Sequence, residues 1–339
     1  MFLIVIYHFC THGIGSDYSF SENDIISVFN NLFCDILIVL SSICVNLYVL
    51  ISGYFLLYCD FKSSRIVRTW FLTCFYSFII TLLFYIILPG SVTIPMLIKS
   101  LFPISTDYYW FVTQYIGVLL LSPFIGILAR ILNRKQYIFL LIALGFICLS
   151  LIPDFPLGKR YHVAHGNSVI FFSYLFFVAG YIRRFLGLVS TKGLVVSIVV
   201  VIIFMALWTL YIGHNHLYWF DYNAIPFILS ILVFILFKQI TMKVSRFVIF
   251  LTKIAPYTFA VYLIHDHLLV RSWLWPRLNL QSACSELYFP FALIFICCVI
   301  FLICVGIDWI RKRIFRLICI DDLILRVDKY LKFPVDNDH

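Results

Sequence analysis

Charged side chains are scarce in this sequence. Only 12% of the 339 residues are Asp, Glu, Lys or Arg, and 63% are hydrophobic, whereas soluble domains average about 25% charged residues. A soluble protein of this composition could not cover its surface with polar groups. The mean hydropathy of +1.03 therefore predicts an all-α, polytopic membrane protein.

Motifs of several common enzyme classes are also missing. The sequence has no Gly-rich phosphate-binding loop, no G-x-S-x-G nucleophile elbow, no zinc-protease motif and no C-x-x-C pair. These absences argue against the enzyme classes that the motifs define. The 11 cysteines do not indicate a disulfide framework, because most lie in apolar runs where burial in the membrane is expected.

Long apolar runs are what the sequence has instead, and their breaks divide it into ten predicted spans. A full span needs about 20 apolar residues, so the first one is partial. We expect residues 1–316 to form one transmembrane domain and 317–339 a cytoplasmic amphipathic tail. The predicted spans are 1–10, 31–58, 66–88, 108–129, 136–152, 167–182, 193–213, 222–240, 250–270 and 288–310.

Basic residues predict the orientation of these spans. Alternate connections, together with the C-terminal tail, hold 20 of the 25 Lys and Arg residues. Because the more basic side of a membrane protein faces the cytoplasm, both termini are expected there. Topology thus accounts for the net charge of +9, and nucleic-acid binding is not needed to explain it.

Two titratable residues are expected near the outer face on consecutive, antiparallel spans. His8 lies near the outer end of the first span, and Asp35 lies just inside the outer end of the second. A carboxylate that accepts a hydrogen bond from one imidazole nitrogen leaves the other nitrogen as a base. Such a base could deprotonate a sugar hydroxyl. The alternative is that both groups face interfacial water.

Two motifs lie at the inner ends of predicted spans. In RIVR, Arg65 and Arg68 are three residues apart, share a helix face and would suit a pyrophosphate. The alternative is that they simply obey the positive-inside rule. In ISGY (51–54), Gly53 allows close approach of a helix or a ligand.

Histidines also occur in YLIHDH (262–267) and in two outer loops. Tyr262 and His265 are three apart on one face, although an interfacial aromatic and polar belt would explain them equally well. The loop histidines have spacings that can bind a metal, but no Cys or carboxylate completes a set of ligands. We therefore predict no metal site from the loop histidines, which are His162, His165, His214 and His216.

Six short segments occur in an order that resembles the acyltransferase-3 family of bacterial membrane acyltransferases, which includes O-acetyltransferases of surface polysaccharides. The resemblance runs through nearly the whole chain. The segments are YHF (7–9), LYVLISGYFL (47–56), RIVR (65–68), YYWFVTQYIGVLLLSPFIG (108–126), FFVAGYIRR (176–184) and YTFAVYLIHDHLL (257–269).

This resemblance implies transfer of an acetyl or other small acyl group from acyl-CoA to a carbohydrate hydroxyl. The acceptor would be an O-antigen, capsule, exopolysaccharide or glycolipid at the bacterial cytoplasmic membrane. The family's motifs place the catalytic histidine at His8, donor-binding residues at Ser52, Gly53, Tyr54, Arg65 and Arg68, and acceptor-side residues at Trp110, Tyr262 and His265.

The sequence departs from the family pattern at one point. The family has an Arg separated from its first-span histidine by ten residues, and this Arg would precede Met1. Either the protein made in the cell begins upstream and carries the Arg, or the protein is truly short and impaired. We expect the first, because the other motifs are intact and seven apolar residues cannot span a membrane.

Two other functions fit a ten-span protein with charged groups in the membrane. One is a transporter or flippase for a lipid-linked sugar, but the sequence shows no inverted repeat. The other is a polysaccharide polymerase, for which a long, Arg-rich outer loop would be expected. The longest outer loops here, near 89–107 and 152–166, are short.

Overall fold

The computed structural model describes residues 1–15, 24–106, 108–149, 168–211, 224–241, 243–278 and 280–331, and these parts contain helices and no strands. The long helices are α2 (Ile25–Ser41), α3 (Cys44–Leu56), α4 (Ser63–Ile87), α6 (Trp110–Ile131), α7 (Arg134–Cys148), α9 (Val169–Phe185), α10 (Thr191–Tyr211), α11 (Ala224–Gln239) and α15 (Phe289–Leu317). The shorter elements are α1 (Phe2–His8), η1 (Phe9–Gly15), α5 (Ile94–Lys99), α12 (Arg246–Ile254), η3 (Ala255–Tyr257), α13 (Thr258–His265), α14 (Leu268–Leu278), η4 (Leu280–Ala283) and α16 (Ile320–Tyr330).

Every predicted span has a helical counterpart, so the expected all-α, polytopic fold is confirmed. Within the described residues, six helices or helix pairs are long and apolar enough to cross a membrane. Two of these are pairs that the sequence presents as one run: α2 continues into α3, and α12 continues through η3 into α13. The helices α1–η1 and α11 are apolar but shorter.

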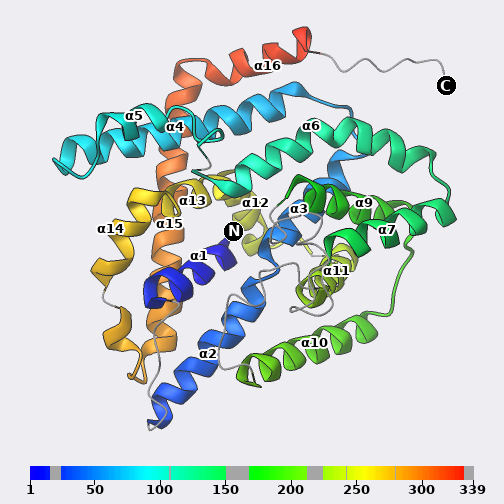
Figure 1. Ribbon diagram of the computed structural model, residues 1–339, viewed down its shortest axis with the longest axis horizontal. Coiled ribbons are helices and arrows are strands. Elements are labelled where there is room, and N and C mark those ends of the chain that lie inside the picture. Colours follow the sequence, from blue (N-terminus) through cyan, green and yellow to red (C-terminus); the bar gives the residue numbers. More distant parts are fainter. Residues whose placement is uncertain are drawn as a thin grey trace.

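Helix α1 lies in the middle of the molecule, beside α2, α13 and α15 (Figure 1). Val5, Ile6 and Phe9 are buried in the main hydrophobic core. The helix continues as the π-helix η1, a form that is frequent at functional sites. Gly13 packs closely here, because a Cβ atom on it would lie 2.6 Å from the Leu280 side chain and 3.1 Å from that of Trp275.

Helices α3, α6 and α9 form a second packed group. Gly53 of α3 lies directly against the backbone of α9, where a Cβ atom would come within 2.9 Å of the Phe176 Cα atom. The small residue of ISGY therefore serves close helix packing, which is the ordinary role of glycine inside a membrane bundle.

One end of this group carries the basic residues Arg65, Arg130, Arg183, Arg184 and Lys238, and we call it the basic end. Its cations hydrogen-bond the last carbonyl groups of neighbouring helices, which have no partner inside their own helix. The donor–acceptor pairs include Arg183 to Tyr54 O (2.5 Å), Arg130 to Leu57 O (3.2 Å), Arg184 to Ala129 O and Leu132 O (2.7 and 2.8 Å), and Lys238 to Leu186 O (3.2 Å). The basic residues from which the orientation is predicted thus also join the helices.

Candidate active site

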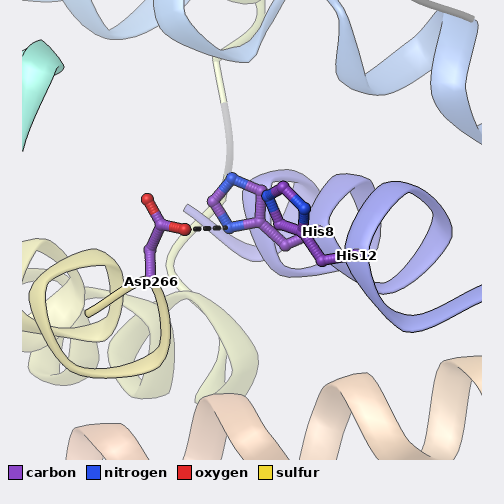
Figure 2. Close-up of side chains that lie close together, drawn as sticks. All are labelled: His8, His12 and Asp266. Atoms are coloured by element: carbon purple, nitrogen blue, oxygen red, sulfur yellow. Dashed lines mark ion pairs between the residues drawn. The ribbon is translucent and has the colours of Figure 1, made fainter. Parts of the chain in front are cut away.

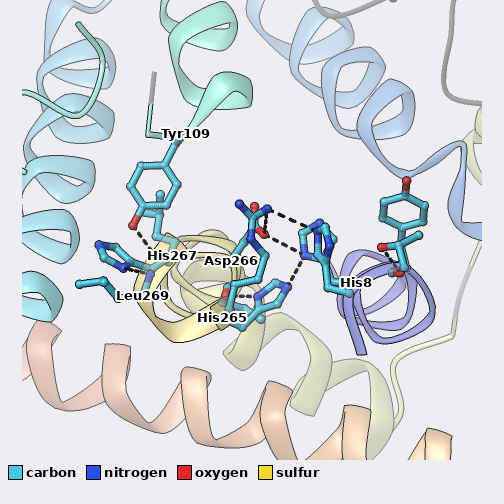
Figure 3. A network of polar contacts seen from close by, with 12 residues as sticks. His8, Tyr109, His265, Asp266, His267 and Leu269 are labelled. Carbon is cyan, nitrogen blue, oxygen red and sulfur yellow. Dashed lines mark hydrogen bonds and ion pairs between the residues drawn. The ribbon is translucent and has the colours of Figure 1, made fainter. Parts of the chain in front are cut away.

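His8, His265 and Asp266 meet at a buried point between α1 and α13 (Figure 3). Each histidine is the last residue of its helix, and Asp266 is the C-cap of α13. The Nδ1 atom of His8 lies 2.9 Å from Nε2 of His265 and 3.4 Å from Oδ1 of Asp266. The exposed fractions are 9% for His8 and Asp266 and 1% for His265.

A chain of hydrogen bonds determines which nitrogen of His8 carries the proton. The Nδ1 atom of His265 lies 2.5 Å from the carbonyl oxygen of Val261. A carbonyl can only accept, so His265 donates from Nδ1, and Nε2 of the neutral ring is then an acceptor. His8 must therefore donate from Nδ1 to His265. This tautomer leaves the lone pair of His8 Nε2 available to accept a proton.

Two residues connect this buried group to the surface. His12, one turn beyond His8, is exposed, and Arg271 of α14 is partly exposed. Arg271 Nη1 lies 3.4 Å from His12 Nε2 and 3.5 Å from Asp266 Oδ1. We call His8, His12, His265, Asp266 and Arg271 the His8 cluster.

The ligand atoms of His8, His12 and Asp266 all lie within 4.8 Å of one another, which is close enough for a metal site. Figure 2 shows these three side chains gathered together. The neighbouring groups argue against a resident cation. Arg271 already places a positive charge against both His12 and the Asp266 carboxylate. The Nδ1 atom of His8 is used by His265. The loop histidines considered above lie outside the described residues.

The carboxylate beside His8 is that of Asp266, whereas the sequence suggested Asp35. Asp35 is on α2 and is buried, with 1% of its surface exposed. The sequence could place Asp35 along its span but could not give the rotation of α2 about its axis. Asp266 directly follows His265 in YLIHDH, and this adjacency was the signal that could have found it.

Of the other residues expected on the outer side, Tyr262 lies on α13 beside the cluster and Trp110 lies on α6. Tyr262 is buried, and its ring centre is 5.8 Å from that of Tyr109, whose hydroxyl donates to Leu263 O at 2.9 Å. Trp110 is half-buried at the start of α6. His267 belongs elsewhere, because its Nδ1 accepts from Leu269 N at 3.2 Å and so caps the start of α14.

At the basic end, Arg65 and Arg68 have different neighbours. Arg65 lines a pocket of about 290 Å³ together with Arg130 and Asp60, between the end of α3, the start of α4 and α6. Arg68 is 54% exposed and lies 3.7 Å from Asp321 of α16. The structure therefore does not bring both guanidinium groups to one pocket.

The residues of ISGY lie on α3, in the turn before the pocket residue Leu56. Ser52 is one turn before the pocket residue Leu56, and its hydroxyl lies 3.0 Å from the hydroxyl of Tyr115. Tyr54 packs against the guanidinium of Arg183, 5.4 Å from its ring centre. Donor binding by Ser52, Gly53 and Tyr54 stays a prediction.

The structure thus has a buried histidine with an available imidazole nitrogen in the His8 cluster and a basic pocket at the basic end, an arrangement that fits a membrane enzyme of group transfer. The chain belongs to the acyltransferase-3 family, since the model of the family's acyltransferase domain matches residues 1–309. It is therefore a membrane acyltransferase. Neither the curated proteins nor the solved structures contain a significant match.

Proposed function

We propose that this protein transfers an acetyl or other small acyl group from acyl-CoA to a hydroxyl of a cell-surface polysaccharide or its lipid-linked precursor. It would act in the bacterial cytoplasmic membrane with both termini in the cytoplasm. The observation that carries the proposal is the hydrogen-bond chain from His8 through His265 to Val261 O, which leaves His8 Nε2 as a base.

The proposed reaction uses His8 twice. Its Nε2 atom takes the proton of the acceptor hydroxyl as the hydroxyl oxygen attacks the thioester carbonyl carbon. The C–S bond then breaks, and the proton passes from His8 to the CoA sulfur, so the products are the ester and free CoA. While His8 is protonated, the Asp266 carboxylate 3.4 Å from Nδ1 stabilises the imidazolium.

The pocket at the basic end would hold the donor phosphates. Its Arg65 and Arg130 supply positive charge, and guanidinium groups bind phosphate oxygens well. At about 290 Å³ the pocket is too small for the whole of CoA. Thr81 of α4 lies 3.4 Å from His267, and Arg65 comes sixteen residues earlier on the same helix. At 1.5 Å per residue the two ends are about 24 Å apart, and the pantetheine arm would cover this distance.

The test is transfer of radiolabelled acetyl from acetyl-CoA to carbohydrate in membranes that contain the protein. We expect His8→Gln to abolish transfer and His267→Gln, a buried histidine outside the His8 cluster, to retain it. Full activity in His8→Gln would refute the assignment of the base. Glycan analysis of the host with and without the gene should show a lost O-acyl group; a changed chain length with unchanged acylation would favour a polymerase.

A further inference from the structure

The C-terminal helix α16 lies alongside the first turns of α4, antiparallel to it (Figure 1). The backbone N–H and the hydroxyl of Ser64 donate to the two carboxylate oxygens of Asp328, at 2.7 and 2.6 Å. Ser63 also donates a hydrogen bond to the Leu331 carbonyl. Ile324 is buried, with 6% of its surface exposed. Helix α16 is therefore docked by polar contacts as well as by packing.

The Asp328 carboxylate occupies a position that suits an anion. The first N–H groups of a helix have no partner within it, and they carry the positive end of the helix dipole. Asp328 takes one of these N–H groups together with a hydroxyl, and the charges of Lys62 and Arg65 act on it from α4. Phosphate oxygens bind helix N-termini through the same kinds of donor.

A second carboxylate of α16 reaches the other motif arginine. Asp321 lies seven residues, or about two turns, before Asp328, and its Oδ1 atom is 3.7 Å from Arg68 Nη2. The pair is largely exposed, so its contribution is small. The pair matters because of where it lies. Through Asp328 and Asp321, helix α16 contacts Ser64 and Arg68, which lie on either side of Arg65 in the sequence.

We propose that α16 is an intramolecular competitor that holds the anion-binding groups at the start of α4 until the phosphates of the acyl donor displace it. The proposal rests on the proposed function, since it takes acyl-CoA as the donor. Arg65 lines the proposed donor pocket, and its charge also acts on Asp328. Because phosphate and carboxylate use the same donors, phosphates that extend from this pocket onto Ser64 and Arg68 require Asp328 and Asp321 to leave. The docked helix then lowers the affinity for the donor, and donor binding releases the helix.

The first test measures binding of CoA and the KM for acetyl-CoA with the full chain in lipid nanodiscs. Asp328→Asn and Asp321→Asn weaken the competitor, and Asp322→Asn is the matched control because Asp322 is exposed on the same helix. We expect Asp328→Asn to lower both the Kd and the KM by about three- to tenfold, with a smaller effect for Asp321→Asn and none for Asp322→Asn. An equal affinity in all four proteins, or a weaker one in Asp328→Asn alone, would overturn the proposal.

The second test measures hydrogen exchange of α16 amides in the wild-type chain with and without saturating CoA. We expect exchange in 320–330 to rise when CoA binds. If CoA binds and this exchange does not change, the competitor is refuted while the acyltransferase assignment stands. If CoA binds to none of the proteins, the assignment of the donor fails and the proposal fails with it.

Discussion

Removing the charge of Asp266 gives the most direct test of the His8 cluster. In Asp266→Asn the shape of the side chain is kept, but no negative charge remains 3.4 Å from His8 Nδ1. Two opposite unit charges at this distance attract by about 5 kcal/mol at an effective dielectric constant of about 20. Arg271, 3.5 Å from the same carboxylate, offsets part of this attraction.

We therefore expect Asp266 to stabilise the His8 imidazolium by about 2–4 kcal/mol, which corresponds to a loss of kcat of roughly 30- to 1,000-fold in Asp266→Asn. The assay is acetyl transfer from acetyl-CoA by the protein in nanodiscs, with amounts matched by protein stain. His267→Gln is the control for a change at a neighbouring buried residue. A kcat within threefold of the wild type would refute the role of the Asp266 charge.

Arg271 allows a sharper version of the same experiment. In Asp266→Asn its guanidinium lacks the Asp266 carboxylate and opposes a positive charge on His8. The double variant Asp266→Asn/Arg271→Gln removes that cation as well. We expect the double variant to be about tenfold more active than Asp266→Asn alone. If the loss of kcat in the double variant equals the product of the losses in Asp266→Asn and Arg271→Gln, the charges of Arg271 and Asp266 do not act together on His8.

Three further predictions concern stability and docking. Gly53→Ala should lower the free energy of unfolding by about 1–3 kcal/mol, because the new methyl group meets the backbone of α9. The control is Gly306→Ala, which has open space around it and should not lower this free energy. Thermal unfolding in detergent measures both variants. Asp308→Asn should lower the free energy of unfolding by about 3 kcal/mol, because the bidentate partner Arg311 keeps its charge without a carboxylate; an unchanged midpoint in the same thermal assay would show that this ion pair is not structural. Partial burial would raise the pKa of Asp328, but hydrogen bonds from Ser64 and the nearby charges of Lys62 and Arg65 outweigh it and lower this pKa below the ordinary 3.8. A carboxylate with a lowered pKa stabilises docking above 3.8 and loses this effect as the pH falls through its pKa, so protease access to α16 should be constant from pH 8 to 5 and rise only in stronger acid.

The sequence predicted the helices well because each apolar run is long and ends at polar or basic residues. The runs 66–88 and 288–310 correspond directly to α4 and α15. His8 and His265 were both identified as candidates near the outer face. Position along a helix can be read from such runs, because it depends only on distance along the chain.

Rotation about a helix axis could not be read in the same way. It decided that Asp266, and not Asp35, lies beside His8. It also separated Arg65, which faces the pocket, from Arg68, which faces α16. The side chains that complete both places, Arg130 and Arg271, come from helices distant in sequence. Only tertiary packing brings such residues together.

The capping of helix ends by cations links four helices at the basic end. At the basic end, Arg130 and Arg183 tie α6 and α9 to the end of α3, and Arg184 and Lys238 extend the same links to α6 and α11. Each link is a charge-assisted hydrogen bond that must break before the helices can separate. Separation of α3, α6, α9 and α11 at the basic end therefore requires several such bonds to break together.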